Sequence, residues 1–109
     1  SIPALPQFGL ARSDPGHGPK ADPAALIDAL AATKPGDPPI QATDDDFYAV
    51  ADELDRRMRR MRAAGVDVAG ASNAPKRIRD AVMLNQLGAA AREVRQAVNK
   101  VPTLGIAIK

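Results

Sequence analysis

Proline is concentrated in the first 40 residues, which hold eight of the ten prolines of this 109-residue chain. Proline fixes its own φ angle and lacks an amide N–H, so it interrupts helices and the interior of sheets. Gly9, Gly16, Gly18 and Gly36 lie in the same segment. We therefore predict that residues 1–42 form an extended arm and not a continuous helix or a central strand.

One short helix is expected inside this arm, near residues 23–33. Asp22 can cap its amino end, and Pro23 suits the first helical position because that residue needs no amide N–H. The helix should end near Lys34, since a residue that precedes a proline avoids helical geometry. Its apolar face is predicted to carry Leu26, Ile27 and Leu30.

Residues 43–101 show apolar side chains at alternating spacings of three and four, the pattern of amphipathic helices. Thr43 and the three aspartates after it are a strong helix start, and Gly65 is a natural helix end. A second helix should begin at Ser72 or Asn73 and continue to residue 101. The predicted packing or partner interface consists of Phe47, Ala51, Leu54, Met58 and Met61 in the first helix and of Leu84, Leu87, Ala91, Val94, Val98 and Val101 in the second.

These elements predict a mainly α fold, in which a helical hairpin of two long amphipathic helices follows the short N-terminal helix. Pro102 should stop the second helix. Leu104, Ile106 and Ile108 then alternate with smaller residues, so residues 102–109 are expected to form a short strand or an extended tail laid on a partner.

The core of such a fold would be thin, because the chain has no tryptophan, two phenylalanines and one tyrosine. Burial stabilises a fold by roughly 25 cal/mol per Å² of apolar surface, and alanine offers little surface. The chain is long enough for one small domain. We expect stable packing to need other protein subunits, in multiple copies.

The strongest charge feature is the segment RRMRRMR at residues 56–62. Asp52, Glu53 and Asp55 each precede an arginine by four residues, in the favourable order for helical ion pairs. This spacing predicts three pairs, Asp52 with Arg56, Glu53 with Arg57 and Asp55 with Arg59. Arginines of the last turn would complement the helix dipole. A solvated, self-compensated helix face is therefore the favoured interpretation.

The alternative is contact with phosphates. A hairpin would bring the segment KRIR at residues 76–79 close to the same end, and such a basic surface could bind nucleic acid without reading its sequence. The candidate anion contacts are Arg56, Arg57, Arg60, Arg62, Lys76, Arg77 and Arg79. No aromatic residue that could stack on bases accompanies them, and the net charge is only +2.

No set of residues predicts catalysis, a cofactor or a metal. Cysteine is absent, and His17 is the only histidine, so a triad or a histidine metal site would depend on one residue. The consecutive side chains of Asp44, Asp45 and Asp46 would point about 100° apart on a helix and would not converge on a cation. Residues 14–20, DPGHGPK, lack the spacing of a phosphate-binding loop.

No apolar run approaches the ~20 residues that span a bilayer, and no signal peptide is seen. We therefore expect a non-enzymatic structural subunit in a virion or a cytoplasmic assembly. The favoured particle is a virus or bacteriophage, with the chain as a minor capsid, cementing or connector protein. The alternatives are a nucleic-acid-binding or packaging accessory protein and a helical adaptor of a secretion or motility apparatus.

Overall fold

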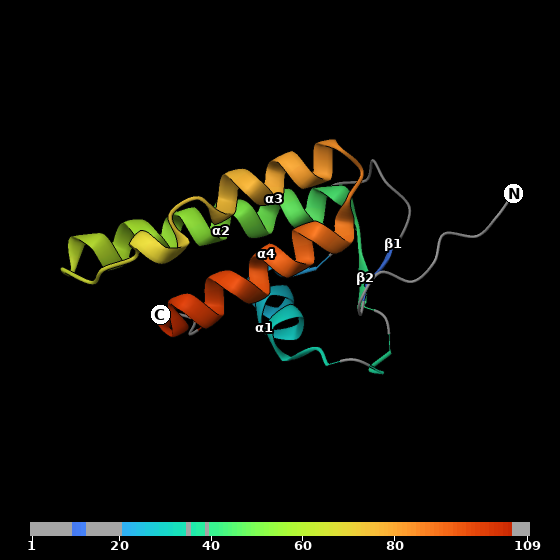
Figure 1. Cartoon of the computed structure of the whole chain (residues 1–109), viewed down its shortest axis with the longest axis horizontal. Coiled ribbons are helices and arrows are strands. Elements are labelled where there is room, and N and C mark those ends of the chain that lie inside the picture. Colours follow the sequence, from blue (N-terminus) through green and yellow to red (C-terminus); the bar gives the residue numbers. More distant parts are fainter. Residues whose placement is uncertain (1–9, 13–20, 35, 39, 106–109) are drawn as a thin grey trace, which may run out of the picture.

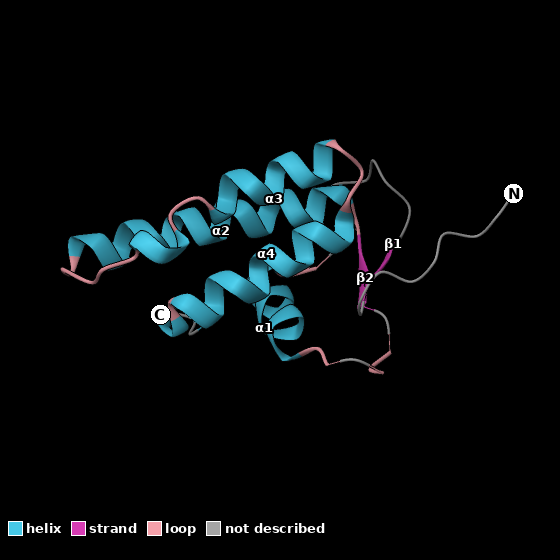
Figure 2. Cartoon of the chain, viewed as in Figure 1, coloured by secondary structure: helices cyan, strands magenta, loops and turns pink. Residues whose placement is uncertain are grey.

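The computed structural model describes residues 10–12, 21–34, 36–38 and 40–105, and these are mostly helical (Figures 1 and 2). The helices are α1 (Pro23–Ala32), α2 (Asp44–Ala63), α3 (Ala74–Met83) and α4 (Leu87–Lys100). Two short 3₁₀ turns are η1 (Ala69–Ala71) and η2 (Pro102–Gly105). Strands β1 (Leu10–Arg12) and β2 (Ile40–Ala42) pair in parallel, with Leu10 opposite Ile40. The prediction of a mainly α fold is confirmed.

The helices form a ring around one core. α2 and α4 run in the same direction and α3 runs in the opposite direction (Figure 1). α3 packs against both α2 and α4, and α1 also packs against these two helices. The short N-terminal helix is therefore a structural member of the helical body.

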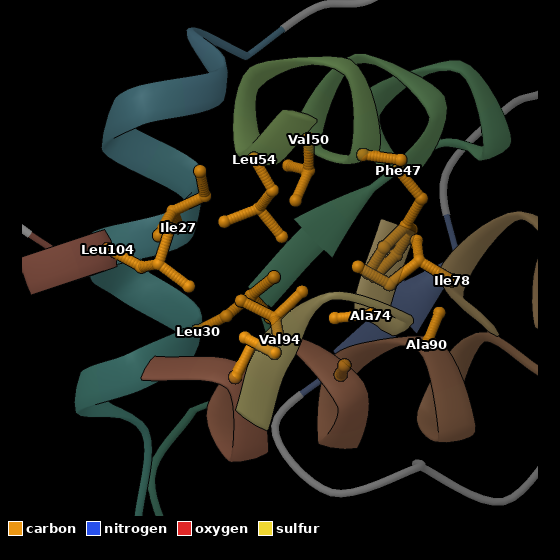
Figure 3. Packing of buried hydrophobic residues seen from close by; sticks show 14 of the residues in the cluster. Ile27, Leu30, Phe47, Val50, Leu54, Ala74, Ile78, Ala90, Val94 and Leu104 are labelled. Atoms are coloured by element: carbon orange, nitrogen blue, oxygen red, sulfur yellow. The ribbon is translucent and has the colours of Figure 1, made fainter. Parts of the chain in front are cut away.

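The core is aliphatic, and every helix contributes to it (Figure 3). Phe47 of α2 is its one fully buried aromatic residue among the residues described. Leu104 of η2 is also fully buried. The prediction of an extended tail is thus wrong for residues 102–105, which fold onto their own chain, while residues 106–109 lie outside the described residues. The labelled side chains that meet in Figure 3 are Ile27, Leu30, Phe47, Val50, Leu54, Ala74, Ile78, Ala90, Val94 and Leu104.

The predicted cap of α2 by Thr43 is confirmed, and Asp46 makes the capping reciprocal. The hydroxyl of Thr43 accepts a hydrogen bond from the amide of Asp46 at 3.0 Å, and the Asp46 carboxylate accepts one from the amide of Thr43 at 2.8 Å. Asp46 is buried and also accepts from the amide of Ala21 at 3.0 Å. The carboxylate therefore caps α2 and ties the segment that leads into α1 to it.

The prediction of a single second helix from residue 73 to residue 101 is wrong. The chain turns at Asn85, whose φ angle of 58° lies in the left-handed region. The amide of Asn85 donates to the carbonyl of Val82, and the amide of Gln86 donates to the carbonyl of Ala81. This is the Schellman arrangement that ends helices, and asparagine can supply its left-handed residue. The break allows α4 to fold back along α3.

α2 ends in the same way, and here the sequence prediction of an end at Gly65 is confirmed. Gly65 has a φ angle of 81°, and its amide donates to the carbonyl of Arg62. The amide of Val66 donates to the carbonyl of Met61. Glycine adopts this conformation without steric strain, so the helix stops where the next residues must turn towards α3.

Candidate functional site

The residues predicted for helix packing mostly lie in the core of this chain. Phe47, Ala51, Leu54, Met58, Met61, Leu87, Ala91, Val94 and Val101 are buried, and Val98 is partly buried against them. Leu84 is the exception, because the turn at Asn85 directs it outward and leaves it 67% exposed. Its neighbour Met83 is 75% exposed. We call Met83 and Leu84 the apolar corner.

Arg57, which the sequence offers as an anion contact, is buried and only 1% exposed. Its guanidinium donates to the Glu53 carboxylate at 2.9 Å and to the carbonyl of Leu104 at 2.5 Å. Glu53 also accepts from Arg56 at 2.7 Å. The predicted pair of Glu53 with Arg57 is therefore present, but Arg57 holds η2 against α2 and cannot reach a ligand in solvent.

The electrostatics around Glu53 follow from these contacts. Burial acts to raise the pKa of its carboxyl, but the hydrogen bonds and positive charges of Arg56 and Arg57 outweigh it and hold that pKa below its ordinary value. The charged form of the carboxylate is thus favoured in the folded chain.

Arg79 of α3 pairs with two further acidic residues of α2. Its guanidinium donates to Asp52 at 2.6 Å and to Asp55 at 2.9 Å. The hydrogen bonds that Arg79 donates to Asp55 and Asp52 raise its pKa above the ordinary value. The predicted pairs of Asp52 with Arg56 and of Asp55 with Arg59 are wrong, because a residue from the neighbouring helix reaches these carboxylates.

The rest of the KRIR segment is also compensated within the chain. Lys76 pairs with Asp80 at 2.8 Å, and Arg77 approaches Glu93 of α4 at 3.9 Å. Among the candidate anion contacts, an acidic partner in the described part of the chain is present at Arg56, Arg57, Lys76, Arg77 and Arg79.

Three arginines near the end of α2 have exposed side chains. Arg59, Arg60 and Arg62 are exposed, and neither Arg59 nor Arg62 has an acidic partner in the described part of the chain. The small residues 63–65 and Val66, all exposed, follow them at the turn. We call Arg59, Arg60, Arg62 and residues 63–66 the basic tip.

A hollow lies where η1 and the start of α3 face the second half of α4. Its empty volume is about 370 Å³, and part of this space is open to solvent. Arg77 and Glu93 lie on its wall and offset each other's charge, and Lys100 adds one positive charge. The remaining wall is formed by Ala69, Gly70, Ala71, Asn73, Ala74, Gln96 and Ala97.

Within the described ranges, no group of three or more acidic, histidine or cysteine side chains is placed to hold a metal ion. Asp46 caps α2, and His17 lies outside the described residues. In the same ranges no helix combines the length and apolar character needed to cross a bilayer.

The apolar spacing places Leu84 in a continuous apolar stripe and so does not reveal the apolar corner. The available signal was Asn85, the kind of residue that occupies left-handed positions at helix ends.

Comparisons with protein families, with curated proteins and with solved structures give no match.

Proposed function

We propose that this chain is a non-enzymatic structural subunit of a larger protein assembly, and that the apolar corner is one of its contacts. The observation that carries the proposal is the exposure of Met83 and Leu84, at 75% and 67%, in a chain that buries most of its other large apolar side chains. Burial of each of these two side chains against a partner would stabilise the complex by roughly 1–2 kcal/mol. Such a pair favours a protein surface as its partner.

The charged side chains favour the same function over nucleic-acid binding. Arg56, Arg57, Lys76, Arg77 and Arg79, all candidate anion contacts, are paired with acids of the chain. A phosphate would have to displace these acids, and Arg57 is buried, so binding to these residues would be weak and salt-sensitive. A packaging or nucleic-acid accessory role is therefore the less favoured alternative.

The proposal also extends to the kind of assembly that contains the chain. We propose a virus or bacteriophage particle, with the chain as a minor capsid, cementing or connector protein, because small subunits with extended proline-rich segments recur there. A helical adaptor of a secretion or motility apparatus would use the same kind of protein contact, so identification of the partner distinguishes the two.

The test is photocrosslinking in the cells that normally produce the chain. A photoreactive benzoylphenylalanine in place of Leu84 samples the apolar corner, and the same residue in place of Ala29 is the control, since Ala29 is exposed on α1. We expect a protease-sensitive adduct from position 84 that is several-fold stronger than that from position 29.

The identity of the adduct decides between the functions. A protein that belongs to a particle or an apparatus supports the proposal and names the class of assembly. No adduct above the control level, or an adduct only to nucleic acid, contradicts a protein contact at the apolar corner.

A further inference from the structure

We infer that the partner at the apolar corner is a second copy of this chain, which binds through its basic tip, so that copies associate head to tail. This inference rests on the proposed function and specifies the partner. Three features of the described residues support it: the positions of the two surfaces, their charges and the sizes of their side chains.

The two surfaces lie at opposite ends of the α2–α3 pair (Figure 1). Arg79 bonds to Asp52 and Asp55, which fixes the register of the two antiparallel helices. From this point the apolar corner is only a few residues further along α3, near the start of α2. The basic tip is at the far end of α2, about 30 Å from its start for a 20-residue helix. One copy therefore cannot bring its own two surfaces together.

Charge differs strongly between these ends. Residues 44–55 of α2 contain six acidic residues and no basic one, whereas residues 56–62 contain five arginines and no acidic one. Asp52 and Asp55 share Arg79, and Glu53 pairs with Arg56 and Arg57, so residues 44–57 together with Arg79 carry a formal charge of −3. Asp67 adds one negative charge beside the tip. The remaining asymmetry still favours contact between the acidic end of one copy and the basic end of another.

The two surfaces also differ in the size of their side chains. The apolar corner projects two large, flexible side chains, and methionine adapts to irregular surfaces. The basic tip presents Ala63, Ala64 and Gly65, with Val66 40% exposed beside them. A side-chain atom built on Gly65 would have no neighbour within 4 Å among the atoms of the chain, so this part of the tip is open. The small residues that follow the arginines therefore leave room for Met83 and Leu84 of a second copy.

A contact between two different surfaces of identical chains is heterologous, and repetition of it gives a ring or an open filament. Both surfaces are small, so the association should be weak and should depend on concentration. This is the behaviour of a subunit that assembles in many copies.

The test uses two variants of the full chain, each with one surface removed. R59E with R62E removes the basic tip, and M83E with L84E removes the apolar corner. Sedimentation velocity at rising concentration should show self-association of the unchanged chain and monomers for each variant alone. Because each variant keeps the surface that the other has lost, an equimolar mixture should form a one-to-one dimer and nothing larger.

Matched controls separate this result from general charge effects. K34E with R92E reverses two exposed positive charges elsewhere, and A29E with A32E adds two acids to the exposed side of α1. Both should associate like the unchanged chain. Circular dichroism checks that each variant is folded, and R59Q with R62Q replaces the tip variant if charge reversal unfolds it.

Three results would overturn the inference: an unchanged chain that is monomeric at every concentration, a tip variant that still associates, or a mixture that remains monomeric. The proposed function is judged separately by the crosslink at position 84. An adduct to a different protein, with no adduct of two copies, sustains the structural role and removes the head-to-tail contact.

Discussion

The guanidinium of Arg57 donates a hydrogen bond to the carbonyl oxygen of Leu104, 47 residues later in the chain, at 2.5 Å. Arg57 is 1% exposed, and its guanidinium also donates to the carboxylate of Glu53. The positive charge is thus buried with one acid and one backbone acceptor. This contact fastens η2 to α2 and closes the core beside the end of α4.

Replacement of Arg57 by methionine should lower the free energy of unfolding by about 3 kcal/mol, because it leaves the buried Leu104 carbonyl without its donor and removes the ion pair of Arg57 with the half-buried Glu53. Urea unfolding followed by circular dichroism measures this loss. Arg59→Met is the matched control, since Arg59 is exposed on the same helix, and it should change stability by less than about 0.5 kcal/mol. Equal losses in both variants would show that the buried contact contributes little.

Stability should fall in acid partly through Glu53. The pKa of its carboxyl is lowered in the folded chain, because the arginine contacts outweigh burial. The stabilisation is therefore complete above the unfolded pKa of about 4.3 and is lost as the pH falls through the lower folded pKa. Urea unfolding between about pH 6 and pH 3 should show a shallower acid dependence for Glu53→Gln than for the unchanged chain. Parallel curves would argue against this contribution.

Replacement of Asp46 by alanine should reduce stability by about 1–2 kcal/mol, because it removes a helix cap and leaves buried amides without an acceptor. Hydrogen exchange should accelerate at the amides of Ala21 and Thr43, which both donate to this carboxylate. Asp28→Ala on the exposed side of α1 is the control. Unchanged protection of the Ala21 amide would disprove the link between α2 and the segment before α1.

Asn85 should tolerate glycine but not valine. Its φ angle of 58° suits glycine, whereas a β-branched residue there is strained, so Asn85→Val should lower the free energy of unfolding by about 1–2 kcal/mol. Gln86→Val places the same side chain one residue later, at a negative φ angle of −113°, and serves as the control. Thermal unfolding measures both. A neutral Asn85→Val variant would mean that the chain can continue as one helix across this position.

Short-range signals predicted much of the helical framework. The cap at Thr43, the cap at Asp22 and the end at Gly65 each depend on residues within a few positions, and each is found in the structure. The apolar spacing also placed most of the predicted packing residues in the core.

The same spacing could not reveal the turn at Asn85. Leu84 and Leu87 continue a spacing of three and four across it, so the pattern is the same whether the helix continues or stops. Ion-pair partners were mispredicted for a related reason. Asp52 and Asp55 have arginines four residues later, but the guanidinium of Arg79 from another helix donates to their carboxylates at 2.6 and 2.9 Å.

Three of the helix ends follow from the sequence alone, because caps and a left-handed glycine act through neighbours along the chain. The burial of Arg57, the place of Leu104 in the core and the exposure of Leu84 arise only in the folded chain. These outcomes depend on which elements meet in space. Burial and pairing between residues far apart in the chain are set by the packing of whole helices, and local pattern does not specify that packing.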